Sequence, residues 1–171
     1  METELEKVLM SFYKTDMISY LSHHPESFEE ALHLAITDKQ PYSWRAAWLL
    51  WSCMDENDIR IRGHIRSIIE CIREKSDGHQ RELLKILYLM EIDEEFEGIL
   101  FDHCIRIWEK INKKPSVRFT AFKVIVKISR KYPELSKEIG FLTQDHYMEA
   151  LSKGIRHSLN RMINGLETND Q

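Results

Sequence analysis

The sequence has little glycine and proline. Six glycines and four prolines occur among its 171 residues, which is about half of the share that these two residues hold in an average soluble domain. Turns between short β-strands rely on these residues, so the composition argues against a turn-rich β-sandwich and against a disordered tract. The glycines occur singly along the chain, so the sequence has no glycine-rich loop that could cradle phosphate groups.

Long apolar runs and paired cysteines are absent from the sequence as well. No run reaches the roughly 20 apolar residues that a membrane-spanning helix needs. The chain begins with the acidic segment 1–4 instead of the basic start of a secretory signal. Cys53, Cys71 and Cys104 make no Cys-x-x-Cys spacing and lie among Ile, Leu or Trp, where a free thiol behaves as a small apolar group. We therefore expect a reduced, cytoplasmic protein with no membrane partner.

An excess of basic charge is also missing. The chain carries 24 basic and 28 acidic residues, a net charge of −4, which argues against a protein whose main role is to hold nucleic acid. Residues 103–131 are an exception, because they contain nine basic side chains and one acidic one. Within them, Lys123, Lys127, Arg130 and Lys131, the basic stripe, recur at helical spacing. The basic stripe is either a solvated helix face or an anion-binding site, and the first interpretation is favoured.

Apolar residues recur at helical spacing along most of the chain. Leu5, Val8 and Leu9 show this pattern, as does the segment 117–128, and no segment alternates in the manner of a strand. Ser, Asp and Asn residues suited to helix N-caps separate the apolar segments, and the prolines fall in the same gaps. The pattern predicts an all-α fold with helices near residues 3–22, 27–38, 43–54, 58–75, 79–91, 94–112, 116–131 and 144–166.

A period of about 36 residues runs through the sequence. The pattern Ile-x-acid-Lys begins at Ile36, Ile72 and Ile107. An arginine near the start of the following predicted helix recurs at Arg45, Arg81 and Arg118, and Arg156, which follows Gly154 and Ile155, extends the series. Such a period indicates helical hairpins that stack on their neighbours. We expect a single repeat domain over residues 1–171, with a capping helix within 1–24 and repeats at 27–54, 58–91, 94–131 and 141–166.

Two segments carry a resemblance to a known family. Residues 115–121, Pro-Ser-Val-Arg-Phe-Thr-Ala, resemble the opening of the second helix in HEAT and armadillo-like α-solenoid repeats, and residues 44–47, Trp-Arg-Ala-Ala, are a weaker copy. The resemblance implies an α-α superhelix of about four helical hairpins. It also implies a ladder in which the acid that closes one helix pairs with the arginine that opens the next. The implied pairs are Asp38 with Arg45, Glu74 with Arg81, and Glu109 with Arg118.

Residues with catalytic or metal-binding chemistry are present, but their spacing is unsuitable. His23 and His24 are adjacent, and no His-x-x-x-His pair supplies the spacing of metal ligands. The acids between Glu91 and Glu97 lie at a predicted helix start, where carboxylates stabilise the helix dipole without any catalytic role. We therefore assign no catalytic residue, no metal and no cofactor.

The sequence favours a small non-catalytic scaffold that binds a partner protein or peptide along the surface lined by the second helices of its repeats. The alternative is a DNA-binding repair protein, because alkylpurine glycosylases have a similar HEAT-like architecture and clasp DNA with basic helices and aromatic side chains. Trp44, Trp48, Trp51 and Trp108 could supply such side chains, but the first three fit the core of the helix 43–54 better. Together with the acidic net charge, this interpretation disfavours nucleic acid as the partner.

Overall fold

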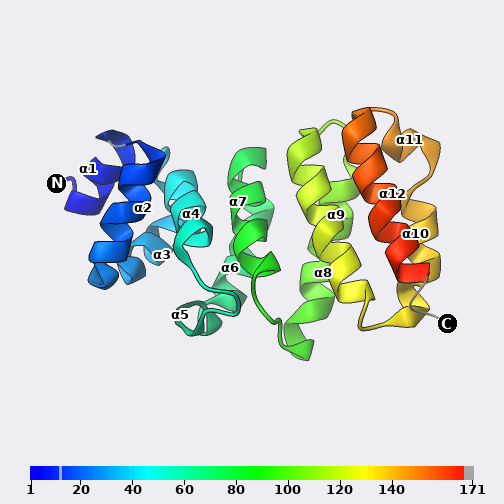
Figure 1. The fold of residues 1–171 in the computed structure, drawn as a ribbon, viewed down its shortest axis with the longest axis horizontal. Helices are drawn as coiled ribbons and strands as arrows, with labels where there is room; N and C mark the ends of the chain where they lie inside the picture. Colours follow the sequence, from blue (N-terminus) through cyan, green and yellow to red (C-terminus); the bar gives the residue numbers. More distant parts are fainter. Residues whose placement is uncertain (12, 168–171) are drawn as a thin grey trace. The chain divides into compact units, whose positions relative to one another are not determined.

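The described part of the chain, residues 1–11 and 13–167, is built from helices in the computed structural model (Figure 1). It contains twelve α-helices, three short 3-10 helices and no strand. The all-α prediction is therefore confirmed. None of these helices is long and apolar enough to cross a membrane.

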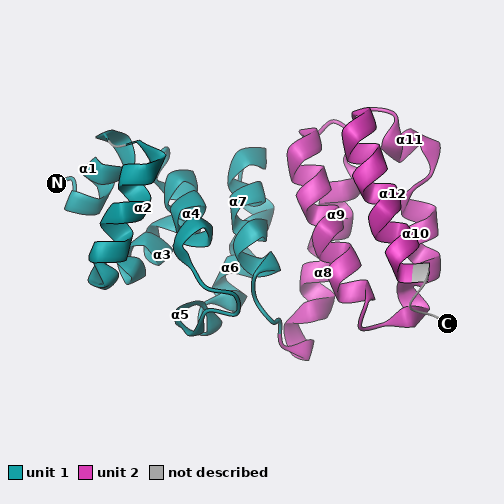
Figure 2. Ribbon diagram, viewed as in Figure 1, with its two compact units in different colours: residues 1–92 teal, residues 93–171 magenta. Residues whose placement is uncertain are grey.

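The chain divides into two compact units (Figure 2). Unit 1 spans residues 1–92, and unit 2 begins at Asp93. The boundary falls between the second and third predicted repeats, so each unit holds whole helical hairpins. Each unit also has its own core of buried aliphatic side chains.

Unit 1 is organised around its fourth helix. Its helices are α1 (Glu4–Ser11), α2 (Lys14–His23), α3 (Phe28–Ile36), α4 (Tyr42–Cys53), α5 (Ile59–Arg62), α6 (Ile65–Cys71) and α7 (Asp77–Tyr88), with 3-10 turns at Pro25–Ser27 and Ile72–Glu74. Helix α4 packs against α3 and α7 and also touches α1 and α2. Its residues Ala46, Ala47, Leu49 and Leu50 are fully buried. The two alanines let neighbouring helices approach closely, because the distance between helix axes depends on side-chain size at the contact.

Unit 2 is built on a long helical hairpin. Its helices are α8 (Glu94–Glu109), α9 (Pro115–Ser129), α10 (Ser136–Leu142), α11 (Asp145–Met148) and α12 (Lys153–Glu167), with a 3-10 turn at Pro133–Leu135. Helices α8 and α9 pair, and α12 packs against α9. The buried Trp108 ring lies against Phe122, with 4.7 Å between ring centroids. Its Nε1 donates a 2.8 Å hydrogen bond to the Leu142 carbonyl, so one side chain links α8, α9 and α10.

A buried acid fastens the start of α8 to the end of α9. Glu97 is 4% exposed and accepts hydrogen bonds from the Lys131 ammonium and, at 2.5 Å, from the Tyr132 hydroxyl. Burial raises the pKa of Glu97, but the bonds from Lys131 and Tyr132 outweigh it and leave this pKa below its ordinary value. The same contact raises the pKa of Tyr132 to about 12. One member of the basic stripe, Lys131, therefore has a structural partner.

Two predicted helices in unit 1 are divided in the structure. The expected helix 3–22 is the pair α1 and α2, because the backbone of Tyr13 is extended, with φ −68° and ψ 161°. The expected helix 58–75 is broken between α5 and α6 at Gly63 and His64, where His64 has φ −112° and ψ −2°. Glycine is a poor helix former, and an unbroken apolar pattern in the sequence concealed this break.

The C-terminal region holds more helices than the sequence predicted. Helix α10 was not expected, because only Ile139 and Leu142 of its residues are buried and two apolar positions make no readable period. The expected helix 144–166 is the pair α11 and α12. Between them Leu151 is buried, so the connecting segment packs against the protein instead of continuing a helix.

A buried histidine joins α7 to α3 and to the connection between α3 and α4. His79 is fully buried. Its Nε2 donates to the Ala35 carbonyl at 2.6 Å, and its Nδ1 accepts from the Gln40 side-chain nitrogen at 3.0 Å. Because a carbonyl only accepts, this arrangement holds the neutral imidazole with its proton on Nε2. Burial lowers the pKa of His79 below its ordinary value.

We predict that the free energy of unfolding falls as the pH is lowered from about 7.5 to about 5.5. The pKa of His79 is lower in the folded state, so the unfolded chain binds more protons in this range and acid favours unfolding. Urea unfolding at a series of pH values measures the effect. His79→Gln should show a shallower pH dependence than the wild type, and His33→Gln, which alters an exposed histidine of α3, should not. Equal pH dependence of the wild type and His79→Gln would contradict the prediction.

Candidate functional site

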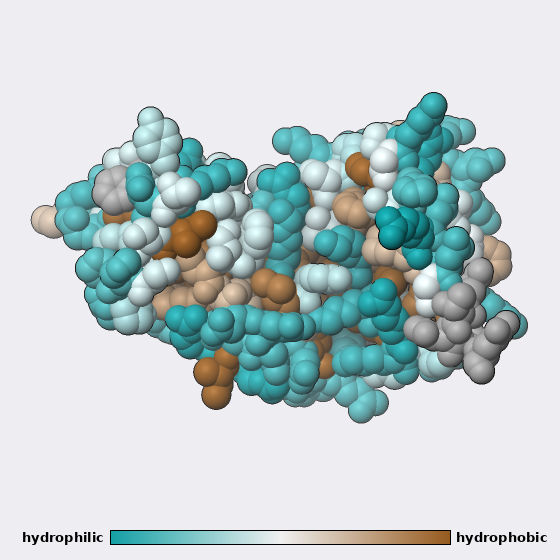
Figure 3. Space-filling model, viewed as in Figure 1, coloured by the Kyte–Doolittle hydropathy of each residue, from teal (hydrophilic) through white to brown (hydrophobic). Residues whose placement is uncertain are grey.

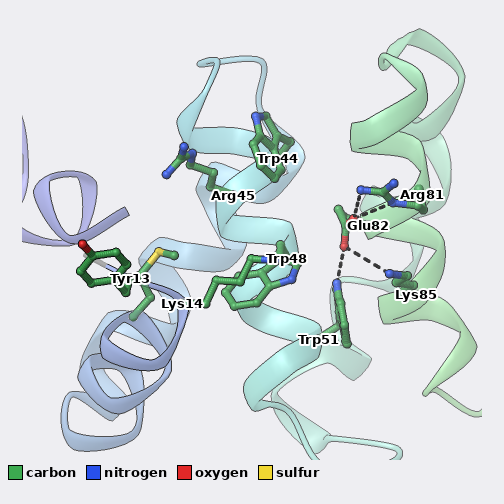
Figure 4. Close-up of a pocket in the computed structure, with 10 residues that line it drawn as sticks. Tyr13, Lys14, Trp44, Arg45, Trp48, Trp51, Arg81, Glu82 and Lys85 are labelled. Carbon is green, nitrogen blue, oxygen red and sulfur yellow. Dashed lines mark hydrogen bonds and ion pairs between the residues drawn. The ribbon is translucent and has the colours of Figure 1, made fainter. Parts of the chain in front are cut away.

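Unit 1 contains an open groove lined by side chains from α2, α4 and α7 (Figure 4). Its volume is about 610 Å³, within the range of ligand-binding pockets. We call it the aromatic–basic groove and define it by its lining residues: Tyr13, Lys14, Met17, Trp44, Arg45, Trp48, Trp51, Arg81, Glu82 and Lys85. Surface of low polarity, white to brown in Figure 3, gathers over the part of unit 1 that holds α2 and α4.

Helix α4 supplies the aromatic wall of the groove. Trp44, Trp48 and Trp51 are spaced i, i+4 and i+7, so they share one helix face. Trp44 is 36% exposed, and Trp48 and Trp51 are half-buried. The rings of Trp48 and Trp51 meet edge to face, with 6.2 Å between centroids. The interpretation of these three tryptophans as core residues is therefore wrong, because the core face of α4 is occupied by alanine and leucine.

Cationic side chains lie over each of the three indole rings. The Lys14 ammonium is 5.3 Å from the centroid of Trp48, and the Lys85 ammonium is 4.4 Å from that of Trp51. The Arg45 guanidinium is 5.4 Å from the centroid of Trp44. Cations within about 6 Å of a ring face are attracted by its quadrupole. These contacts hold positive charge close to the aromatic wall.

A buried carboxylate on α7 fixes the edge of the wall. Glu82 is 1% exposed and accepts a hydrogen bond from the Trp51 indole nitrogen. It also accepts from Arg81, whose Nε and Nη2 lie 2.8 and 2.7 Å from one carboxylate oxygen. Lys85 is 3.9 Å from the other oxygen, and Figure 4 shows the whole cluster. The groove thus combines four cationic side chains with one carboxylate.

Arg45 ties the groove to the N-terminal helix. Its Nη1 donates a 2.7 Å hydrogen bond to the Leu9 carbonyl, which lies in the last turn of α1, where helix carbonyls lack intrahelical partners. The Nε of Arg45 is buried and makes no hydrogen bond within residues 1–11 and 13–167. Because the Leu9 carbonyl carries no charge, this hydrogen bond does not neutralise the positive charge of the Arg45 guanidinium.

The arginines of the predicted ladder have other partners than the predicted acids. Arg45, Arg81 and Arg118 each lie within the first five residues of α4, α7 and α9, so they occupy one register. Their bonds, however, run to the Leu9 carbonyl, to Glu82, and to backbone carbonyls in unit 2. The acids Asp38, Glu74 and Glu109 are exposed, and Asp38 accepts from Gln40 instead.

Arg118 is the structural member of this set. Its side chain is fully buried, and its Nε donates to the Trp108 carbonyl at 2.9 Å while Nη2 donates to the Tyr147 carbonyl at 2.6 Å. Its guanidinium also lies 4.6 Å from the Trp108 ring centroid. Burial lowers the pKa of Arg118. This arginine therefore holds the end of α8 and the segment around α11 to α9.

The basic stripe lies on the second half of α9 and just beyond it. Lys123 and Lys127 are half-buried, and Arg130 and Lys131 are exposed. Lys131 bonds Glu97, and the Lys123 ammonium is 5.9 Å from the Phe119 ring centroid. The stripe belongs to unit 2 and contributes nothing to the aromatic–basic groove. Among the described residues, no cluster of His, Cys, Asp and Glu could hold a metal ion.

Comparison with known families agrees with the helical hairpins. A family model described as a HEAT repeat domain matches residues 1–166. The chain belongs to the HEAT repeat family. The resemblance found in the sequence is thus confirmed. Neither the curated proteins nor the solved structures include a significant match.

In this HEAT repeat protein the sequence of α4 already indicates that its tryptophans lie outside the core. Ala46, Ala47, Leu49 and Leu50 alone supply an apolar face, so the three tryptophans of this helix, spaced i, i+4 and i+7, fall on another face. Arg81 and Lys85 are spaced i, i+4 and therefore share a face of α7. No feature of the sequence indicates that these two faces meet.

We predict that Arg118→Ala destabilises unit 2 by about 2–4 kcal/mol, because the buried Trp108 carbonyl and the partly buried Tyr147 carbonyl lose their donor and an unsatisfied buried group costs about 1–3 kcal/mol. Arg118→Lys should recover only part of this loss, since an ammonium cannot reproduce the planar fork. Chemical denaturation followed by circular dichroism measures the change. The control Arg130→Ala removes an exposed arginine at the end of α9 and should stay within about 0.5 kcal/mol of the wild type. A similarly small effect of Arg118→Ala would refute the assigned role.

We also predict that iodide quenches most of the tryptophan fluorescence of the native protein. Trp44, Trp48 and Trp51 line an open groove whose cations attract the anion, whereas Trp108 is fully buried. Trp108→Phe should keep the quenching, and replacement of the three groove tryptophans by Phe should remove most of it. Acrylamide is neutral, so its quenching measures how accessible the tryptophans are without any attraction by the groove cations. Strong iodide quenching of the variant that retains only Trp108 would mean that the groove is not the accessible site.

Proposed function

We propose that this HEAT repeat protein is a non-catalytic scaffold that binds a segment of a partner protein in the aromatic–basic groove. The observation that carries the proposal is the wall of three indole rings held at the surface by α4. Tryptophan, tyrosine and arginine are the residues most enriched at binding hot spots, and all three types line this groove.

The position of the groove supports a binding role. The groove is lined mainly by α4 and α7, which correspond to the second helices of the first two predicted repeats. Neighbouring repeats bring their second helices together into an extended surface, which repeat proteins use for binding. A partner segment could therefore contact residues from two repeats at once.

The chemistry of the groove supports binding over catalysis. Its one carboxylate, Glu82, accepts hydrogen bonds from Trp51 and Arg81, so its oxygens serve as fixed acceptors in a structural cluster. The three cysteines are free thiols, and burial raises the pKa of Cys53, Cys71 and Cys104, which makes them poor nucleophiles. Free thiols also fit the reduced cytoplasm as the place of this interaction.

The alternative, a DNA-binding repair protein, draws on the same aromatic and basic side chains. A nucleic-acid strand needs a basic field along several nucleotides. Unit 1 has eleven basic and sixteen acidic residues, a net charge of −5. The groove itself combines four cationic side chains with one carboxylate, whereas unit 1 as a whole is acidic, so a short segment of protein is the better fit.

Selection of displayed peptides against the full chain tests the proposal. Peptides enriched on the wild type should bind Trp48→Ala at least about tenfold more weakly, as expected for loss of a hot spot. The matched control is Ile59→Ala, which truncates a side chain of unit 1 that is 80% exposed and outside the groove. Circular dichroism confirms that each variant is folded. Equal binding of the enriched peptides to the wild type and to Trp48→Ala would overturn the groove as the binding surface.

A further inference from the structure

We infer that the partner segment is acidic, with carboxylates on both sides of an apolar anchor that meets the tryptophan wall. This inference rests on the proposed function and adds the chemistry of the partner. It follows from how positive charge is distributed around the wall, from what compensates that charge, and from the charge of the surrounding unit.

Positive charge flanks the aromatic wall on both sides. Lys14 and Arg45 lie on the side toward α2, while Arg81 and Lys85 project from α7 on the other side (Figure 4). An extended segment laid across the indole rings would thus meet cations before and after its central residue. Successive side chains of an extended segment point in opposite directions, so an apolar anchor can face the wall while residues farther along the segment reach the cations.

The two flanks differ in how far their charge is compensated. On α7, Glu82 bonds Arg81 and lies 3.9 Å from Lys85, so one carboxylate is shared between two cations. On the opposite flank, Arg45 bonds a neutral carbonyl and Lys14 rests over an indole ring. The groove therefore has a net charge of +3 from its four cations and Glu82. Carboxylates are the complementary groups that a partner protein would supply.

The acidic surroundings restrict this attraction to short range. Unit 1 as a whole has a net charge of −5, and at physiological salt charges act over about 8 Å. A short acidic segment inside the groove interacts mainly with the groove cations. A long polyanion, with a phosphate charge for each roughly 1.7 Å of duplex, would extend beyond the groove over a unit whose net charge is negative. The balance favours an acidic protein segment over nucleic acid.

Three fluorescent peptides test the inference, each with the same central tryptophan and with aspartates, serines or lysines on both sides. Fluorescence polarisation with the wild-type chain should show the acidic peptide bound at least about tenfold more tightly than the serine peptide. The affinity of the acidic peptide should fall as salt is raised, because the attraction is electrostatic. The lysine peptide should bind most weakly.

Two charge reversals separate the groove from the rest of unit 1. Lys14→Glu should weaken binding of the acidic peptide at least about tenfold and leave the serine peptide little changed. Arg73→Glu makes the same change in net charge at an exposed position outside the groove, and it should alter affinity less than about twofold. Equal loss of affinity in both variants would mean that overall charge, and not the groove, selects the peptide.

The outcomes distinguish this inference from the proposed function. If all three peptides bind equally and Trp48→Ala abolishes this binding, the acidic preference is overturned, but the proposed role of the groove in binding a partner stands. Failure of the acidic peptide to bind the wild type would also overturn the inference. The selection of displayed peptides would then test separately whether the groove binds a partner segment at all. A single-stranded oligonucleotide that binds more tightly than the acidic peptide, with loss in Lys14→Glu, would overturn both in favour of nucleic acid.

Discussion

Close helix packing on one face of α4 determines the surface of unit 1. This helix has only twelve residues, yet it packs against α3 and α7 and touches two further helices. Such contacts need small and aliphatic side chains, which Ala46, Ala47, Leu49 and Leu50 provide. An indole in any of these positions would force the neighbouring helices apart. The three tryptophans are therefore confined to the remaining face, and the aromatic wall of the groove follows from how the hairpins pack.

The recurring arginine shows how one residue type can serve junctions of different shape. Arg45, Arg81 and Arg118 occupy one register, but their acceptors differ. Arg45 bonds a carbonyl in the last turn of α1, Arg81 bonds a buried carboxylate, and Arg118 bonds two backbone carbonyls of unit 2. A guanidinium carries five donors in a planar fork and keeps its charge when buried. It can therefore satisfy whichever acceptors a junction presents. The period in the sequence thus predicts where the arginine lies in the hairpin, but it does not predict which acceptor the arginine binds.

The fold was more predictable from the sequence than the site was. The helix class, the hairpin period and the placement of α3, α4, α8 and α9 follow from apolar spacing and capping residues, which are local properties. The break at Gly63 and the extra helix α10 were missed because a short or interrupted helix carries too few apolar positions to show a period. The groove depends on Lys14, Trp51 and Glu82, which are far apart in the sequence. Their meeting is set by tertiary packing, and the sequence shows only that each lies on a particular helix face.

The cations that rest on the tryptophan rings make access to the aromatic wall conditional. The Lys14 and Lys85 ammonium groups lie over the rings of Trp48 and Trp51, and an apolar group that takes their place on a ring face costs the attraction between ammonium and ring. A ligand that supplies a carboxylate to each displaced lysine offsets that cost, whereas a purely apolar ligand does not. A purely ionic ligand, in turn, leaves the rings covered and gains no apolar contact. The groove therefore favours a ligand that presents carboxylates and an apolar group together over a ligand that presents only one of the two.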